Sequence, residues 1–113
     1  MMNDFPDFMK VPKNHIDNSQ QNTPDVDGYY YTAKDGSQMA FWTCLQDRVS
    51  AEHRHDFDEY MVCISGEYKV TMDGQELILK PGDELWIPRG TLQGGSCKAG
   101  TRTIHAFGGR RIK

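Results

Sequence analysis

Short apolar runs separated by glycine-containing turns make up most of the chain after residue 25. The runs are rich in β-branched and aromatic residues, and the turns include Asp73-Gly74 and Pro81-Gly82. Such runs are typical of strands, and an Asp-Gly pair tolerates the positive φ angles of a tight hairpin. No helical apolar period extends beyond a single turn, so the pattern predicts an all-β fold. We expect strands within residues 26–33, 37–45, 60–65, 67–72, 75–79, 83–87 and 101–107.

The run at residues 60–65 is apolar on both of its faces. Because side chains alternate along a strand, Met61 and Cys63 fall on the face of Glu59, and their neighbours fall on the other face. A strand covered on both sides fits a small barrel or sandwich whose outer face packs against a second sheet or a second subunit. Closing the sheet also removes exposed strand edges.

Trp86 faces away from Leu85 and Ile87 in the same alternation. An outward tryptophan suits a subunit interface, and the alternative is a tryptophan packed under the N-terminal segment. We therefore expect a homodimer that uses this surface.

The N-terminal segment differs from the rest in composition. Residues 12–25 are mostly polar and contain one aliphatic side chain, too little apolar surface to offset the entropy of ordering them. Before them, Phe5, Phe8, Met9 and Val11 form a short apolar cluster, which either latches onto the domain or a second subunit or belongs to a disordered terminus. The expected organisation is an arm at residues 1–25, a barrel domain at residues 26–109 and a flexible basic tail at residues 110–113.

Length and charge narrow the functional classes. A chain of 113 residues fits one domain with one modest core. Its net charge is −3 and its charges are well mixed, so nucleic acid is not an expected partner. No apolar run approaches the roughly 20 residues that span a bilayer, and the N-terminus lacks a signal core. We expect a cytoplasmic protein without a membrane partner.

The three cysteines, Cys44, Cys63 and Cys97, are odd in number and show no C-x-x-C spacing. This argues against a disulfide framework and against a thiolate zinc site. We expect reduced, partly buried thiols.

Residues 51–60, AEHRHDFDEY, contain the strongest candidate chemistry. His53 and His55 point the same way on an extended strand, so their imidazoles can converge on one ion. Glu59 follows a short turn and can return a carboxylate to the same point. Two neutral imidazoles and one carboxylate suit Fe(II), Mn(II), Zn(II), Ni(II) or Co(II), and three protein ligands leave positions open for water or substrate.

This stretch resembles the first motif of the cupin family, in which H-x-H, a glutamate and a glycine mark a metal-bearing β-barrel. Here the matching residues are His53, His55, Glu59 and Gly66. The resemblance extends over roughly residues 26–109 in strand pattern. It implies a single-domain cupin, that is, a double-stranded β-helix or jelly-roll barrel. It also implies one divalent transition metal (Zn, Fe, Mn or Ni) and a small-molecule ligand or substrate.

The second cupin motif is matched by Gly82, Pro88 and Gly90, but Gln93 stands where that motif places a histidine. An amide oxygen is a weaker, neutral ligand than imidazole. Gln93 either completes a His-His-Glu-Gln metal shell or stays outside it and hydrogen-bonds a metal-bound water or the substrate. We expect direct ligation.

The pocket beside the metal is expected to include Phe41, Met61, Cys63 and His105. His105 either acts as a proton shuttle or replacement ligand or is a hydrogen-bonded structural histidine, and the structural role is favoured. Arginines can recognise a carboxylate or phosphate, but only an arginine inside the barrel mouth would do so here.

These features indicate a metal-dependent enzyme with isomerase, lyase or dioxygenase chemistry on a small organic metabolite. No general base stands out in the sequence, so the catalytic residues stay unassigned. The alternative is a non-catalytic cupin that binds or senses a sugar or another metabolite. A barrel that has lost its metal is a third possibility, against which the joint presence of His53, His55 and Glu59 argues.

Overall fold

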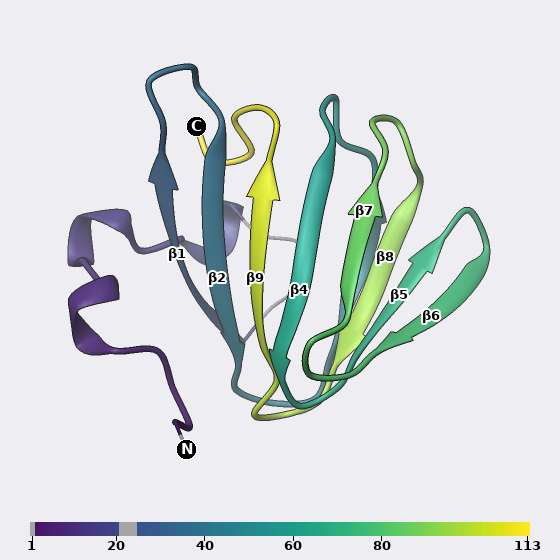
Figure 1. Ribbon diagram of the computed structural model, residues 1–113, viewed down its shortest axis with the longest axis horizontal. Helices are drawn as coiled ribbons and strands as arrows, with labels where there is room; N and C mark the ends of the chain where they lie inside the picture. Colours follow the sequence, from purple (N-terminus) through teal and green to yellow (C-terminus); the bar gives the residue numbers. More distant parts are fainter. Residues whose placement is uncertain (1, 21–24) are drawn as a thin grey trace.

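The computed structural model describes residues 2–20 and 25–113, and the regular secondary structure within them consists mainly of strands (Figure 1). The 3₁₀ helices are η1 (Asp7–Met9), η2 (Pro12–Asn14) and η3 (Asn18–Gln20). The strands are β1 (Val26–Thr32), β2 (Gln38–Cys44), β3 (Arg48–His53), β4 (Glu59–Ser65), β5 (Tyr68–Met72), β6 (Gln75–Leu79), β7 (Glu84–Ile87), β8 (Gln93–Cys97) and β9 (Arg102–Phe107). No helix in the described part of the chain is long and apolar enough to cross a membrane.

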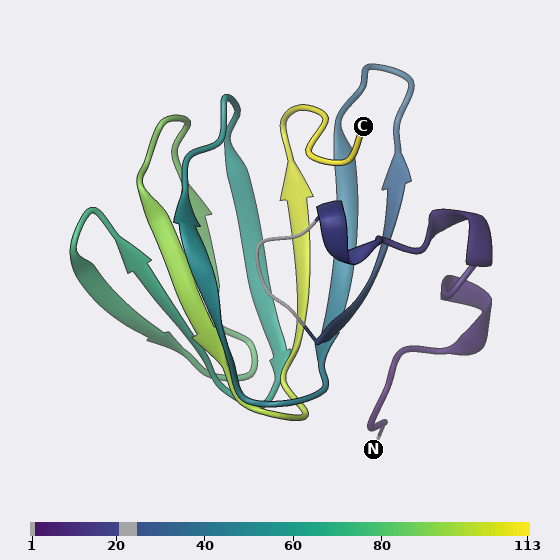
Figure 2. The same ribbon diagram turned by 180° about the vertical axis from the view of Figure 1, so that it is seen from behind.

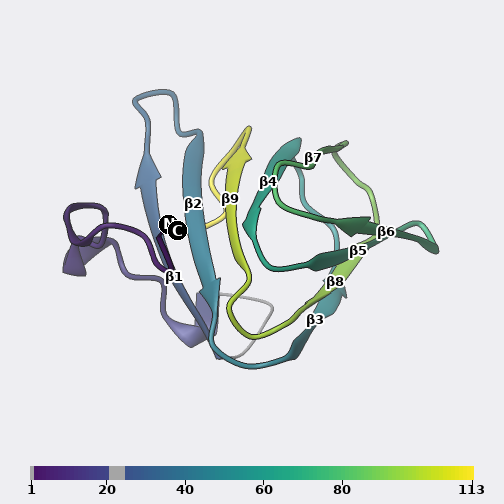
Figure 3. The same ribbon diagram turned by 60° about the horizontal axis from the view of Figure 1, so that its bottom comes forward.

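Two antiparallel sheets face each other across the interior (Figure 3). One has the strand order β1-β2-β9-β4-β7, and the other has the order β3-β8-β5-β6. The chain passes from one sheet to the other between β2 and β3, between β3 and β4 and again between later strands, which is the connectivity of a jelly-roll barrel. The predicted all-β fold is confirmed, and each expected run lies on a strand.

The pattern predicted neither β8 nor most of β3, of which only the end at His53 was expected to be extended. β3 lies at a sheet edge and is mostly exposed, while β8, with the sequence QGGSC, lacks β-branched and aromatic residues. A Cβ at Gly95 would lie 2.8 Å from both the Lys69 carbonyl oxygen and the Tyr68 hydroxyl oxygen. Close backbone approach therefore requires glycine here, and it outweighs strand propensity.

The main core lies between the sheets on the side of β4, β5, β6 and β7. It consists of Met61, Cys63, Val70, Leu79 and Ile87, all buried. The alternation expected along β4 is confirmed, because Met61 and Cys63 point inward with Glu59. Removal of this apolar surface from water is the main force that holds the two sheets together.

Both terminal segments are anchored by one isoleucine each. Ile16 and Ile112 are each 1% exposed, and both belong to a buried cluster with Ala40 and Phe107. The Gln38 side chain donates to the Ile112 carbonyl and accepts from the Ile112 N–H, both at 2.8 Å. These contacts correct the expectation of a flexible tail: one aliphatic side chain and two buried hydrogen bonds hold the end of the chain against the barrel.

The N-terminal arm runs beside β1, outside the barrel (Figure 2). Phe5 is buried, and its ring centroid lies 4.6 Å from that of Phe41 on the outer face of β2. Phe8 is exposed. Phe5 therefore packs onto the domain, which is one of the roles considered for the apolar cluster. Residues 21–24 of the expected arm lie outside the described residues.

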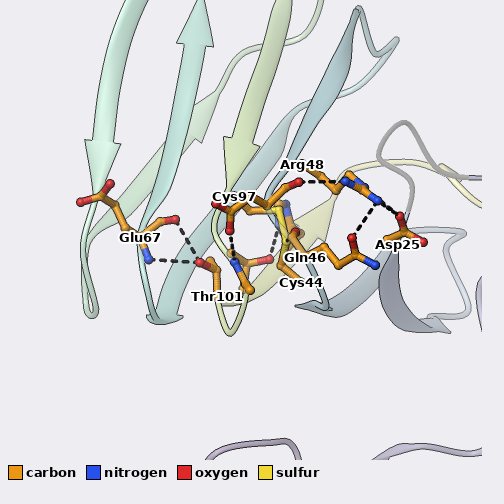
Figure 4. Close-up of a disulfide and its surroundings, with 11 residues drawn as sticks. Asp25, Cys44, Gln46, Arg48, Glu67, Cys97 and Thr101 are labelled. Carbon is orange, nitrogen blue, oxygen red and sulfur yellow. Dashed lines mark hydrogen bonds and ion pairs between the residues drawn. A yellow bond between two sulfur atoms is a disulfide. The ribbon is translucent and has the colours of Figure 1, made fainter.

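A disulfide joins the two sheets at one end of the barrel. Cys44 is the last residue of β2 and Cys97 is the last residue of β8, and their Cα atoms are 6.5 Å apart. Figure 4 shows the bridge between the hydrogen bonds that join Thr101 to the Glu67 backbone and the ion pair of Arg48 with Asp25. The bridge therefore lies within a group of contacts that closes this end.

This bridge corrects the expectation of three reduced thiols, which holds only for Cys63, a free and buried cysteine. The two bridged cysteines are 53 residues apart in sequence. They meet only because one sheet packs on the other, and cysteine spacing does not reveal that.

Glycine is required at the turn between β4 and β5 for two reasons, a positive φ angle and a close approach of another part of the chain. Gly74, in the turn between β5 and β6, shares only the positive φ angle and so serves as a matched control. Gly66 has φ +78°, and a Cβ there would lie 2.6 Å from the Thr101 Cα atom, whereas Gly74 has φ +86° with nothing within 4 Å. We expect Gly74→Ala to cost about 1–2 kcal/mol of unfolding free energy, because only the left-handed backbone is strained. Gly66→Ala should cost more, as measured by urea denaturation. Equal losses in the two variants would contradict the close approach.

Candidate functional site

A buried carboxylate lies at the centre of the candidate site. Glu59, the first residue of β4, is 4% exposed. The Gln93 Nε2 group, from β8 in the other sheet, donates to Glu59 Oε1 at 3.2 Å, and His105 Nδ1, from β9, lies 2.7 Å from Glu59 Oε2. Glu59 therefore connects the two sheets through polar contacts inside the barrel.

Hydrogen bonds and nearby charges set the protonation of Glu59. Burial alone raises the pKa of the Glu59 carboxyl, but the hydrogen bond and charge of His105, with contributions from His55 and Gln93, lower it below its ordinary value. An ionised Glu59 accepts from His105 Nδ1–H, and His105 Nε2 lies 2.9 Å from the Thr103 hydroxyl oxygen. His105 thus lines the cavity with both ring nitrogens hydrogen-bonded, as its favoured structural role requires.

His53 and His55 approach the same cavity from the end of β3. His53 is the last residue of β3 and pairs in register with Gln93, while His55 lies beyond the strand, so they do not share one strand as expected. Their ring centroids are still only 4.7 Å apart. His53 Nδ1 lies 2.8 Å from the Ala51 carbonyl oxygen, and donation to it leaves the Nε2 lone pair of His53 for another partner.

His55 is a neutral imidazole held close to Glu59. Its Nε2 atom is 3.5 Å from Glu59 Oε1, and its ring stacks on Phe57 with centroids 4.8 Å apart. Burial lowers the pKa of His55 to about 4, although the Glu59 carboxylate opposes this shift. A neutral imidazole at physiological pH has a lone pair available for a metal.

The structure therefore brings together His53, His55, Glu59 and Gln93. Within the described residues, no three His, Cys, Asp or Glu side chains are already arranged to hold an ion. The Glu59 oxygens are directed at Gln93 and His105, and Gln93 presents its NH₂ group to Glu59. The donor set still fits a divalent metal chemically, since it contains two imidazoles, a carboxylate and an amide that can present its oxygen after rotation.

These side chains open into an inner cavity of about 70 Å³ between the sheets. The disulfide lines it as well, so the cavity reaches toward the closed end of the barrel. The lining residues are Val26, Trp42, Cys44, Ser50, His53, His55, Glu59, Tyr68, Gln93, Cys97, Thr101, Thr103, His105 and Arg111.

Three residues expected in the pocket wall lie elsewhere. Phe41 is on the outer face of β2, under Phe5, because the alternation of β2 turns Trp42 inward. Met61 and Cys63 do point inward, but they are packed in the main core and do not line the cavity. The pocket wall is correspondingly more polar than the sequence suggested.

Sequence reasoning missed Trp42, Tyr68 and Arg111. Burial raises the pKa of Tyr68 to about 12, so its phenol keeps its proton and can donate to an oxygen in the cavity. Arg111 reaches the cavity because Ile112 anchors the end of the chain. The single aliphatic residue in that otherwise polar segment was the available signal.

Comparison with known proteins gives a family and a fold. The Cupin domain family matches residues 40–106, which is more than half of the chain. Acetate kinase EutQ of Salmonella typhimurium (strain LT2) is 33% identical over 76 residues, and the match covers 67% of this chain and 31% of EutQ. The chain therefore spans only about a third of that relative's length.

Two solved structures share the fold at low sequence identity. KdgF from Halomonas sp. has a TM-score of 0.68 and 19% identity, with 80% of this chain and 87% of KdgF covered. A mutant of salicylate 1,2-dioxygenase from Pseudoaminobacter salicylatoxidans has a TM-score of 0.69 and 13% identity, with 74% of this chain and 26% of the dioxygenase covered.

The lowered pKa of His55 predicts that the stability of the metal-free protein depends on pH. His55 takes up a proton near its ordinary pKa of 6.5 when unfolded but only near about 4 when folded, so the unfolded chain binds more protons between these values. The free energy of unfolding should therefore decrease as the pH falls from about 6.5 toward about 4. Urea denaturation across this range measures it. His55→Gln should flatten this part of the profile, and parallel profiles for His55→Gln and the wild type would contradict the assignment.

Proposed function

Because the chain belongs to the cupin family, we propose that it is a metal-dependent enzyme that acts on a small organic metabolite. In this proposal His53, His55, Glu59 and Gln93 hold one divalent transition metal. The observation that carries the proposal is the convergence of these side chains, from β3, the loop after it, β4 and β8, on one small cavity.

Three of the four proposed ligands are prepared for their role by their surroundings. The Ala51 carbonyl orients His53, and burial keeps His55 neutral. The low pKa of Glu59 keeps its charge available, which offsets the charge of a cation. A divalent metal bound here would supply Lewis acidity or, as Fe(II), a site for O₂.

The remaining polar groups are suited to binding and proton placement. Tyr68 holds its phenolic proton, so it can donate a hydrogen bond to a substrate oxygen. His105 Nδ1 faces Glu59 and its Nε2 faces the Thr103 hydroxyl, so both ring nitrogens already have partners. These groups can orient a ligand through hydrogen bonds.

The reaction belongs to the isomerase, lyase or dioxygenase types found on this fold, and the salicylate dioxygenase with the same fold supports a small organic substrate. Turnover separates an enzyme from a cupin that only binds its ligand. The direct screen offers small 2-oxo acids and sugar phosphates to the metal-loaded protein and follows product formation and O₂ consumption. Saturable binding without turnover would favour the binding protein.

Metal binding tests the proposed ligands one at a time. Isothermal titration with Zn(II), Mn(II), Ni(II) and anaerobic Fe(II) should show one site per chain, and His53→Ala should weaken it by more than the roughly 10–100-fold cost of losing an outer partner. His15→Ala, which removes an exposed histidine in the arm, should leave the affinity unchanged.

Direct ligation by Gln93 predicts tighter binding in Gln93→His and weaker binding in Gln93→Ala, because imidazole is the stronger ligand. Equal affinities would place the amide outside the metal shell. A wild-type protein that binds none of the four metals would overturn the proposed function.

We also propose that the protein forms a homodimer through the outer face of the larger sheet. Strand register aligns Tyr31, Met39, Ala106, Tyr60 and Trp86 in one row across all five strands. All except Ala106 are exposed large side chains. A two-fold axis through this face would lay the same row of one subunit against that of its partner and bury both.

Light scattering distinguishes the dimer from the 12.9 kDa monomer. Trp86→Glu should shift the mass to that of the monomer, because it places a charge within the buried contact. Val49→Glu, at a comparably exposed position on β3 of the other sheet, should keep the dimer mass. A wild-type mass of 12.9 kDa at micromolar concentration would contradict the dimer.

A further inference from the structure

Two cavities meet at His55 and Arg111. The inner cavity, with Glu59, measures about 70 Å³, and an open depression of about 380 Å³ lies outside it; His55 and Arg111 line both. By this measure one water needs about 10–15 Å³, so the inner cavity has room for about five to seven atoms of that size. A metabolite larger than this that reacts at Glu59 would extend past Arg111 into the outer depression.

The outer depression concentrates positive charge on a chain whose net charge is −3. Its charged lining consists of Arg54, Arg110, Arg111 and Lys113 against one carboxylate, that of Asp56. Asp56 is itself 2.7 Å from the Arg89 guanidinium. The charges at the mouth thus favour an anion even though the whole molecule repels one.

Arg111 is held rigidly at the junction of the two cavities. Its guanidinium lies 5.2 Å from the centre of the Trp42 ring and 5.8 Å from that of Phe107, and Nη1 donates to the Gln20 carbonyl at 2.8 Å. A guanidinium carries five N–H donors in a planar fork that matches carboxylate and phosphate oxygens. Burial lowers the pKa of Arg111 and the Glu59 carboxylate opposes that shift, so an anionic ligand would act in the same sense as Glu59.

We propose that the outer depression binds an oxyanion group of the substrate, a carboxylate or a phosphate, with Arg111 at the junction and Arg54 and Arg110 on the rim. The inference rests on the proposed function, because it assigns the reacting part of the same molecule to the Glu59 cavity. The substrate class is then a small organic acid or phosphate ester, and neutral sugars or aromatics are disfavoured.

A matched set of three probes tests the charge requirement. Glycerate, glycerol 3-phosphate and glycerol have similar size but carry a carboxylate, a phosphate and no charge. The chain has two tryptophans, so Trp86→Phe leaves Trp42, beside Arg111, as the reporter of binding by fluorescence. Both metal-free and Zn(II)-loaded protein are titrated, because an anion that only coordinates the metal would bind the loaded form alone.

The expected result is binding of glycerate or glycerol 3-phosphate, but not glycerol, to both forms, and the tighter of the two identifies the carboxylate or the phosphate. Arg111→Gln should weaken binding of the preferred probe about tenfold or more, because a hydrogen bond to a charged group usually contributes that much to affinity. Arg110→Gln, at an exposed position less able to disturb folding, should weaken it less. Lys80→Gln, an exposed lysine in the turn before β7, should leave it unchanged.

Equal binding of the three probes, or equal loss in Arg110→Gln and Lys80→Gln, would overturn the oxyanion site. If the metal titration succeeds and the probes fail, the proposed function stands and the substrate class does not. If the charged probes bind through Arg111 to a protein that takes up no metal, the oxyanion site stands and the metal-dependent function fails.

Discussion

The buried carboxylate of Glu59 is the constraint on which the candidate site depends. A charge removed from water destabilises a fold unless hydrogen bonds and opposite charges surround it. Here two partners come from elements far from Glu59 in sequence, Gln93 in one sheet and His105 on the neighbouring strand of the other. His55, four residues before Glu59, is a third partner in the loop after β3. Satisfying Glu59 therefore fixes how the two sheets face each other at this level of the barrel. A divalent cation would add the remaining compensation for its charge.

The apolar core and the candidate site lie on different sides of the barrel interior. On the side of β4 to β7 the interior is filled by apolar side chains, among them Met61, Val70 and Ile87. On the other side the cavity extends from the disulfide at the closed end to Arg111 at the open end. The chain termini complete the open end, because Ile112 and Ile16 pack into one cluster and so place Arg111 over Trp42. Residues at the edges of the sequence thereby shape the mouth of the pocket.

Much of the fold was predictable from side-chain alternation. The runs around Glu59 and Trp86 gave the correct inward and outward faces, because burial of one face imposes a period of two on any strand. β8 was not predictable in this way, since Gly94 and Gly95 satisfy a backbone contact and carry no hydrophobic signal. The Cys44–Cys97 bridge and the position of Phe41 also depend on how sheets and arm pack, which local pattern does not report.

The same distinction between local sequence pattern and long-range packing applies to the candidate site. His53, His55, Glu59 and Gln93 could be brought together from two short motifs, and the structure places all four at one cavity. The sequence could not predict that the cavity is also lined by Arg111, Tyr68 and Trp42, because long-range packing places each of them there. The basic outer depression is the clearest example: its charges come from residues 54 and 110–113, which no sequence motif connects.

Anomalous X-ray diffraction from crystals of the metal-loaded protein, recorded at the absorption edge of the bound metal, tests the central claim most directly. The account predicts one peak in the inner cavity, about 2.0–2.2 Å from His53 Nε2, from a ring nitrogen of His55 and from a Glu59 oxygen. No peak at this position, or a peak bound only by side chains elsewhere on the chain, would contradict it.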